Sequence, residues 1–162
     1  RATEAFGADV AFLYADVAGA GLLPTEAERQ GKIVVTTEMG GGEPVSARIH
    51  RMCQDGLRNV LIHFGVLPGT VPSRKARWVQ SLDTSDYRFA PESGIYENCV
   101  DLGDAVRRGD VVGQVHFLER PDRRPEPVFA NADGMLVANR APSLVAQGDC
   151  VACIAHEVDP HV

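Results

Sequence analysis

The C-terminal part of the chain contains a repeated pattern, and this repeat constrains the fold more than any other feature. Ser-Gly-Ile-Tyr-Glu at 93–97 is followed by Val-Arg-Arg-Gly-Asp-Val-Val-Gly-Gln-Val at 106–115. Asp-Gly-Met-Leu-Val at 133–137 is followed by Val-Ala-Gln-Gly-Asp-Cys-Val-Ala-Cys-Ile at 145–154. Two units of nearly equal length, each made of short apolar runs and glycine turns, predict a small β-sandwich with approximate twofold symmetry.

The repeat is similar to the barrel-sandwich fold of lipoyl and biotinyl carrier domains. In each copy a Gly-Asp pair follows a valine, which is typical of a turn with positive φ that leads into a strand. Carrier domains attach their cofactor to a lysine at a hairpin tip. The only lysines of this chain are Lys32 and Lys75, and both lie outside the repeat, so the pattern argues against a swinging-arm carrier.

A proline-rich and glycine-containing segment, Leu67 to Ser73, separates two kinds of periodicity. Before it the spacing of apolar residues indicates both helices and strands, and after it only short strands are indicated. We therefore predict an α/β segment over residues 1–69 and a β-rich domain over residues 70–162.

Two apolar runs in the α/β segment predict strands. Val10 to Ala15 is a candidate for a short buried strand, and Lys32 to Glu38 is a β-branched run of the sort that lies inside a sheet covered on both faces. Between them, Pro24 to Gly31 predicts a short helix with proline near its start and glycine at its end.

The apolar residues from Val45 to Leu67 recur at helical spacing and predict a long helix. Asp55 and Gly56 lie in its middle and predict a kink or break there. Arg1 to Gly7 resembles the last turns of another helix that ends at a glycine, which suggests that further residues precede this chain.

Composition excludes several classes of protein. The chain has 162 residues, 44% of them hydrophobic, which excludes intrinsic disorder. It has 16 Lys and Arg against 22 Asp and Glu, a formal net charge of −6, with 6% aromatic residues. This balance argues against nucleic acid and against a basic membrane-surface protein. Since no apolar run approaches the roughly 20 residues that span a bilayer, we expect a soluble protein.

The four cysteines predict a reducing compartment and a cytoplasmic location. They stand in apolar sequence surroundings, at spacings that suggest no disulfide framework. Cys150 and Cys153 copy a redox spacing, but on a predicted strand instead of a helix N-terminus that would lower the thiol pKa. We therefore interpret them as structural.

Glu38 is the strongest candidate for a catalytic residue. It ends the predicted 32–38 strand and precedes Gly40, Gly41 and Gly42 and then a helix, the place where open α/β sheets put their ligand sites. A carboxylate there can take a proton from water and return it to a leaving group. The alternative is a strand-end glutamate that caps the next helix or faces solvent. The glycines would let a ligand approach the backbone, but they match no phosphate-binding pattern.

The histidines form no convincing metal site. His116 and Glu119 have a His-x-x-Glu spacing, but on a strand these positions point to opposite faces. His50 and His63 fall on the long helix as surface or boundary residues, while His156 and His161 lie near the C-terminus. Neither a Ser-His-Asp elbow nor a His-Glu-x-x-His motif is present.

Five motifs together carry a family resemblance over nearly the whole chain. They are Thr-Thr-Glu-Met-Gly-Gly-Gly at 36–42, Gly-Leu-Arg-Asn-Val-Leu-Ile-His-Phe-Gly-Val-Leu at 56–67, Ser-Gly-Ile-Tyr-Glu at 93–97, Asp-Leu-Gly at 101–103 and Val-Arg-Arg-Gly-Asp at 106–110. In this order they resemble the C-terminal half of the succinylglutamate desuccinylase/aspartoacylase family, closest to its N-acetyl-diaminobutyrate deacetylases.

The resemblance implies a zinc-dependent amide hydrolase with a carboxypeptidase-like α/β catalytic domain and a β-rich C-terminal domain. It implies metal ligands upstream of this chain, a His-x-x-Glu and a later His, and it places Glu38 at the position of the catalytic glutamate. Gly40, Gly41 and Gly42 would then adjoin the N-acyl amino acid substrate. Glu43 and Pro44 depart from the family pattern, which continues with glycine, so the acyl group and the amino acid stay open. The role of Glu97 also stays open.

Two functions of different classes therefore remain. The first is the C-terminal part of a zinc-dependent deacylase that carries the general base and is inactive alone. The second is a non-enzymatic binding or assembly module built on the barrel-sandwich half, with a homo-oligomer left open in either case.

Overall fold

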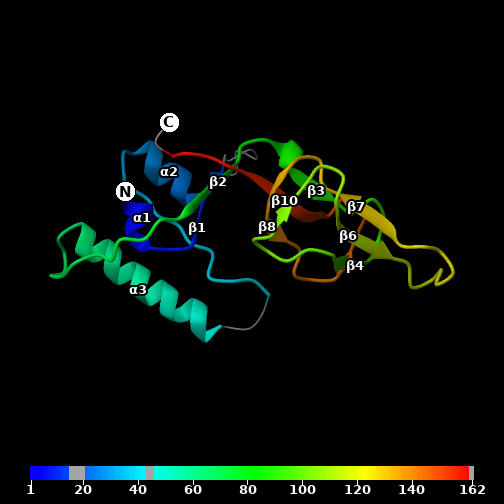
Figure 1. Ribbon diagram of the computed structural model, residues 1–162, viewed down its shortest axis with the longest axis horizontal. Helices are drawn as coiled ribbons and strands as arrows, with labels where there is room; N and C mark the ends of the chain where they lie inside the picture. Colours follow the sequence, from blue (N-terminus) through cyan, green and yellow to red (C-terminus); the bar gives the residue numbers. More distant parts are fainter. Residues whose placement is uncertain (15–20, 43–45, 161–162) are drawn as a thin grey trace. The chain divides into compact units, whose positions relative to one another are not determined.

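The computed structural model describes residues 1–14, 21–42 and 46–160 and divides the chain into two compact units. The first unit comprises residues 1–12 and 16–78, and the second comprises residues 13–15 and 79–162. Each unit is described by itself below (Figure 1).

The first unit contains three helices and most of one strand. α1 spans Ala2–Phe6, β1 spans Val10–Tyr14, α2 spans Leu23–Arg29 and α3 spans Ala47–His63. Gly7 ends α1 in the left-handed conformation, with φ of 82°, so the prediction of a helix that ends at this glycine is confirmed. The helix predicted over 24–31 is also confirmed, and proline lies in its first turn.

The expected break near Gly56 is wrong, because α3 is one continuous helix of 17 residues. Gly56 is buried, and a Cβ built on it would lie 2.5 Å from Cε2 of Phe6. The glycine therefore gives the ring of α1 room to pack against the helix axis. The helix stops after His63, where Gly65 has a φ of 73°. The N–H of Gly65 donates to the carbonyl of Ile62, and that of Val66 to the carbonyl of Leu61, as in a Schellman motif.

The 32–38 segment forms neither helix nor strand, so the strand predicted there is not observed. A strand needs a neighbour that accepts and donates its backbone hydrogen bonds, and the described residues provide none for this segment. β1 is present, as predicted, but only Ala11 is buried in it. Its expected burial is therefore wrong in this structure.

The second unit contains two β-sheets. One has the strand order β1-β2-β10-β8-β5, with β3 also paired to β10, and includes the parts of β1 and β2 that belong to this unit. The other has the order β7-β6-β4-β9. The bounds are β2 Arg77–Ser81, β3 Tyr87–Phe89, β4 Gly94–Asn98, β5 Ala105–Val106, β6 Val111–His116, β7 Glu126–Phe129, β8 Gly134–Asn139, β9 Leu144–Val145 and β10 Cys150–Glu157, with a 3-10 turn at Thr84–Asp86.

The strand orders of the two sheets are equivalent. The orders β3-β10-β8-β5 and β7-β6-β4-β9 match when β3, β4, β5 and β6 are exchanged with β7, β8, β9 and β10. Each sheet thus takes two strands from each copy. β3 and β7 extend the repeat beyond the sequence motifs, since Phe89 pairs with Cys150 as Phe129 pairs with Val111.

Equivalent hydrogen bonds hold the two glycine turns. Gly109 has a φ of 91°, and its N–H donates to the carbonyl of Ala130 at 2.8 Å. Gly148 has a φ of 86°, and its N–H donates to the carbonyl of Ala90 at 2.9 Å. The following aspartates, Asp110 and Asp149, accept from the backbone N–H three residues earlier, at 2.8 and 2.9 Å. Each turn is therefore hydrogen-bonded to the residue that follows the first strand of the opposite copy.

Apolar side chains of both sheets form one core. Its members come from both repeats, so the two copies share a single buried interior: Ala90, Tyr96, Val106, Val112, Val115, Phe117, Val128, Ala130, Leu136, Val145, Val151, Ala152 and Ile154. The described part of this unit is thus a two-layer β-sandwich with its own core. No closed barrel is seen in it.

We predict that Gly56→Ala lowers the stability of the first unit by about 1–3 kcal/mol, because the added methyl group overlaps the Phe6 ring. At an exposed position in a helix, the same change would stabilise the protein by about 1 kcal/mol. Urea unfolding followed by far-UV circular dichroism measures the effect. The same substitution made in a Phe6→Leu background should cost less, and an equal cost in both backgrounds would contradict the packing argument.

We also predict that Tyr96→Phe is neutral or stabilising by up to about 1 kcal/mol at neutral pH, because the buried hydroxyl has no hydrogen-bond partner among the described residues. Burial raises the pKa of Tyr96 to about 12. The unfolded chain releases this proton near pH 10, so the wild-type chain loses stability between about pH 10 and 12. Unfolding curves across this range should show a smaller loss for Tyr96→Phe, and equal losses would contradict the assignment.

Candidate functional site

Glu38 lies in an exposed segment between α2 and α3. The hydroxyl of Thr37 donates to the backbone carbonyl of Glu38 at 3.5 Å, while the carboxylate of Glu38 makes no ion pair within the described part of the chain. The side chain is therefore open to solvent and to any group placed against this segment.

The glycine turn after Glu38 needs residues without a side chain. Gly40 has a φ of 91° and Gly42 a φ of 71°, a conformation that other residues rarely adopt. A Cβ built on Gly40 would lie 3.8 Å from Cγ1 of Ile49 on α3. The turn thus passes close to the first turn of α3. Glu43 and Pro44, which depart from the family pattern, lie outside the described residues.

Apolar side chains around this segment are exposed to an unusual degree. Ile33 is 72% exposed and Met39 is 66% exposed. On β1, Val10, Phe12, Leu13 and Tyr14 are 38 to 43% exposed. Exposed apolar surface of this kind is typical of a region that another polypeptide covers. The first unit therefore presents a surface that an isolated domain would bury.

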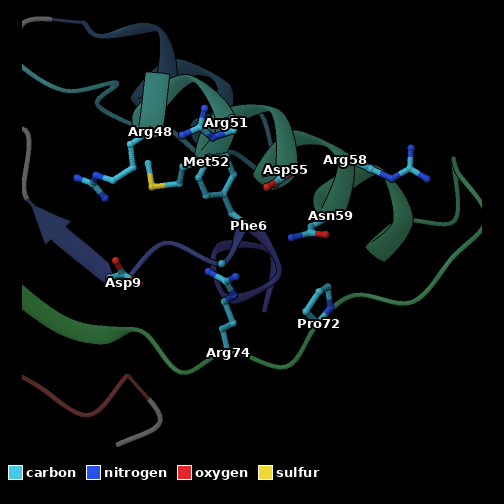
Figure 2. Close-up of a pocket in the computed structure, with 11 residues that line it drawn as sticks. Phe6, Asp9, Arg48, Arg51, Met52, Asp55, Arg58, Asn59, Pro72 and Arg74 are labelled. Carbon is cyan, nitrogen blue, oxygen red and sulfur yellow. The ribbon is translucent and has the colours of Figure 1, made fainter. Parts of the chain in front are cut away.

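A pocket of about 390 Å³ lies in the first unit between α3, the end of α1 and the segment around Pro72 (Figure 2). Four arginines line it, Arg48, Arg51 and Arg58 from α3 and Arg74 from the segment after Pro72. The sequence analysis did not identify this pocket. The spacing of the three helical arginines indicates one face of a helix, but the residues that close the pocket come from distant parts of the sequence.

Glu97 has a structural partner on the neighbouring strand. Nε2 of Gln114 donates to Oε2 of Glu97 at 2.6 Å, and Nε2 of His116 lies 2.6 Å from the same oxygen. These hydrogen bonds lower the pKa of Glu97 below its ordinary value, with Gln114 as the larger cause. His116 is thus paired across the sheet, while Glu119 lies in the turn after β6.

The other histidines are also located. His50 and His63 are exposed on α3, as predicted. Nε2 of His156 lies 3.3 Å from Oδ1 of Asp86, a buried carboxylate in the turn before β3. His161 lies outside the described residues.

All four cysteines are free thiols, but their surroundings differ from the expectation. Cys153 is buried, Cys53 is half-buried, and Cys99 and Cys150 are exposed, so an apolar environment is wrong for the last two. Cys150 and Cys153 both lie on β10, as predicted. Desolvation raises the thiol pKa of both, which is the opposite of an activated redox pair.

Two structural features are absent from the described residues. Among the described residues, no cluster of three or more His, Cys, Asp or Glu side chains could hold a metal ion. Over the same residues, no helix combines the length and the apolar character needed to cross a membrane.

We predict that Gln114→Ala raises the pKa of Glu97 toward its ordinary value, because the hydrogen bond that lowers this pKa most is lost. The carboxyl chemical shift of Glu97, followed by NMR as the pH is lowered, measures this change. Gln147→Ala, in a turn of the other repeat, serves as the control and should leave the titration of Glu97 in place. An unchanged pKa in Gln114→Ala would contradict the pairing.

Comparison with known proteins places this chain beside a group of hydrolases. It is 35% identical over 158 residues to the N-alpha-acetyl-L-2,4-diaminobutyric acid deacetylase of Halomonas elongata, covering 96% of this chain and 46% of that protein. No family model matches the chain.

Solved structures give the same result. The product-bound ectoine utilization protein EutE of Ruegeria pomeroyi superposes with a TM-score of 0.88 at 35% identity, over 96% of this chain and 47% of that protein. A succinylglutamate desuccinylase/aspartoacylase of Rhodobacter sphaeroides does so with a TM-score of 0.88 at 29% identity, over 98% and 48%.

The chain therefore spans about half the length of the proteins it matches. The expected resemblance is confirmed. Over nearly its whole length, this chain is related to the succinylglutamate desuccinylase/aspartoacylase family.

Proposed function

We propose that these 162 residues form the C-terminal part of a longer enzyme that removes the acyl group from an N-acyl amino acid by hydrolysis of its amide bond. The observation that carries the proposal is the 35% identity to a deacetylase over 96% of this chain. The structure of the related EutE protein of Ruegeria pomeroyi is product-bound, which is consistent with a small-molecule substrate.

Residues 1–69 would complete an α/β catalytic domain of carboxypeptidase type, and residues 70–162 would form its β-rich partner domain of barrel-sandwich type. The exposure of Ile33 and Met39 supports the first part of this division, because a covering partner would remove this apolar surface from water. In the longer protein, backbone groups of the 32–38 segment would pair with strands that precede Arg1. The shared core of the two repeats supports the second part.

Glu38 would act as the general base. A carboxylate can accept a proton from the water that attacks the amide carbonyl and then donate that proton to the nitrogen that leaves. Its exposed position next to a glycine turn fits this role, since Gly40, Gly41 and Gly42 present no side chain to obstruct a substrate.

The metal of this family is zinc, which makes water more acidic and polarises the carbonyl. The residues present do not form a site for it, because the described part of the chain lacks a suitable cluster of side chains. We therefore assign its ligands to residues that precede Arg1 and expect this chain alone to be inactive. The free thiols are consistent with a cytoplasmic enzyme.

A second candidate function is a binding or assembly module. The observation that favours it is the complete core of the second unit, which does not need the first unit's side chains. In this case residues 70–162 alone would bind a partner or a second copy of themselves. Sedimentation and pull-down with these residues test it, and a monomer that captures nothing would count against it.

We predict that Glu38→Gln lowers the turnover of the longer enzyme on acyl amino acids by about 10²–10⁴-fold, because the amide cannot accept the proton. The substrate KM should change little. Glu28→Gln, an exposed glutamate on α2 of the same unit, is the matched control and should keep wild-type activity. Near-wild-type turnover of Glu38→Gln would remove Glu38 from the mechanism.

A further inference from the structure

The pocket in the first unit has an excess of positive charge. Among the described residues that line it, its four arginines face two carboxylates, Asp9 and Asp55. With all six groups ionised, two positive charges remain without compensation inside a chain whose formal net charge is −6. A cavity that concentrates the minority charge of its protein indicates a ligand of opposite sign.

The arginines of the pocket have no partner among the residues that the structure describes. Within the described part of the chain, none of Arg48, Arg51, Arg58 and Arg74 makes an ion pair or a side-chain hydrogen bond. Arginines elsewhere in the chain do so, for example Arg29 with Glu26 at 2.8 Å and Arg140 with Asp149 at 2.9 Å. The guanidinium donors of the pocket are therefore free to bind an anion from solution.

The start of α3 adds to the positive potential of the pocket. The first turn of this helix contains no acidic residue, and the side chain of its N-cap, Ser46, makes no capping hydrogen bond. Arg48 instead lies in this turn, where the helix dipole disfavours a cation. An anion bound beside Arg48 would remove this unfavourable interaction.

Arg74 reaches the pocket from the opposite wall. A Cβ built on Gly7 would lie 3.5 Å from Cδ of Arg74, so the aliphatic part of this arginine packs over the glycine that ends α1. Figure 2 shows the Arg74 side chain directed toward Phe6, whereas Arg58 is directed away from that ring. Arg48 and Arg74 thus line the pocket from two separate parts of the chain.

The remaining lining indicates an organic ligand. Phe6 and Met52 provide apolar surface beside the guanidinium groups, and the volume of about 390 Å³ accommodates a small metabolite. We propose that this pocket binds a small organic dianion, with carboxylate or phosphate oxygens that accept hydrogen bonds from Arg48 and Arg74. The proposal does not depend on the role of Glu38, because its test measures binding.

Isothermal titration of the 162-residue chain with succinate and with inorganic phosphate tests this proposal, with sodium chloride added to keep the ionic strength constant. We expect saturable binding of at least one of the two anions. Arg48→Gln and Arg74→Gln should each weaken it about tenfold or more, because each removes a charged hydrogen-bond donor. Arg74→Lys, which keeps the charge but not the guanidinium fork, should bind with intermediate affinity.

Arg124→Gln is the matched control, since it removes the same charge from an exposed position outside the pocket. It should leave binding unchanged. Saturation by succinate alone or by phosphate alone would identify the anionic group and support the site. Absence of saturable binding of both anions, or equal weakening by Arg124→Gln and Arg74→Gln in variants with wild-type circular dichroism, would overturn the proposal.

Discussion

The closure of the β-sandwich depends on hydrogen bonds at two equivalent turns. At Gly109 and Gly148 the backbone has positive φ, and each turn donates to an alanine carbonyl just beyond a strand of the other copy. Because the two copies exchange strands in this way, each sheet contains strands of both copies. The shared core follows from this exchange, since alternating residues of both copies point into one interior.

The described part of the first unit has no closed core, since Ala5 and Ala11 are its only buried apolar side chains. Phe6 packs against Gly56 and joins α1 to α3, while β1 and the 32–38 segment keep apolar side chains exposed. Helix pairs and isolated strands bury little surface, so further elements packed against this unit would add to its stability. The second unit has its own core and the first does not, which fits a chain that spans about half the length of its relatives.

Features that depend on short sequence motifs were predicted correctly, whereas features that depend on contacts between distant parts of the chain were not. The glycine end of α1, the helix at Leu23–Arg29 and the repeat depend on short motifs, and the sequence predicts them. The break predicted at Gly56 was wrong because this glycine makes room for the ring of Phe6, 50 positions earlier in the sequence. No local sequence pattern reveals such a contact. The 32–38 strand was predicted from its β-branched residues, yet a strand is defined by its neighbours, and these are not among the described residues.

The same reasoning applies to the candidate sites. Glu38 could be identified from its place after a β-branched run and before three glycines, whereas the arginine pocket needs Gly7 and Arg74 to meet α3 in space. The contrast between the units is also electrostatic. Arginines that pair with carboxylates, such as Arg123 with Glu92, reinforce turns of the sandwich, while those of the pocket have no protein partner within the described residues. Unpaired guanidinium groups that line a cavity contribute little to folding, so their placement is better explained by a ligand than by stability.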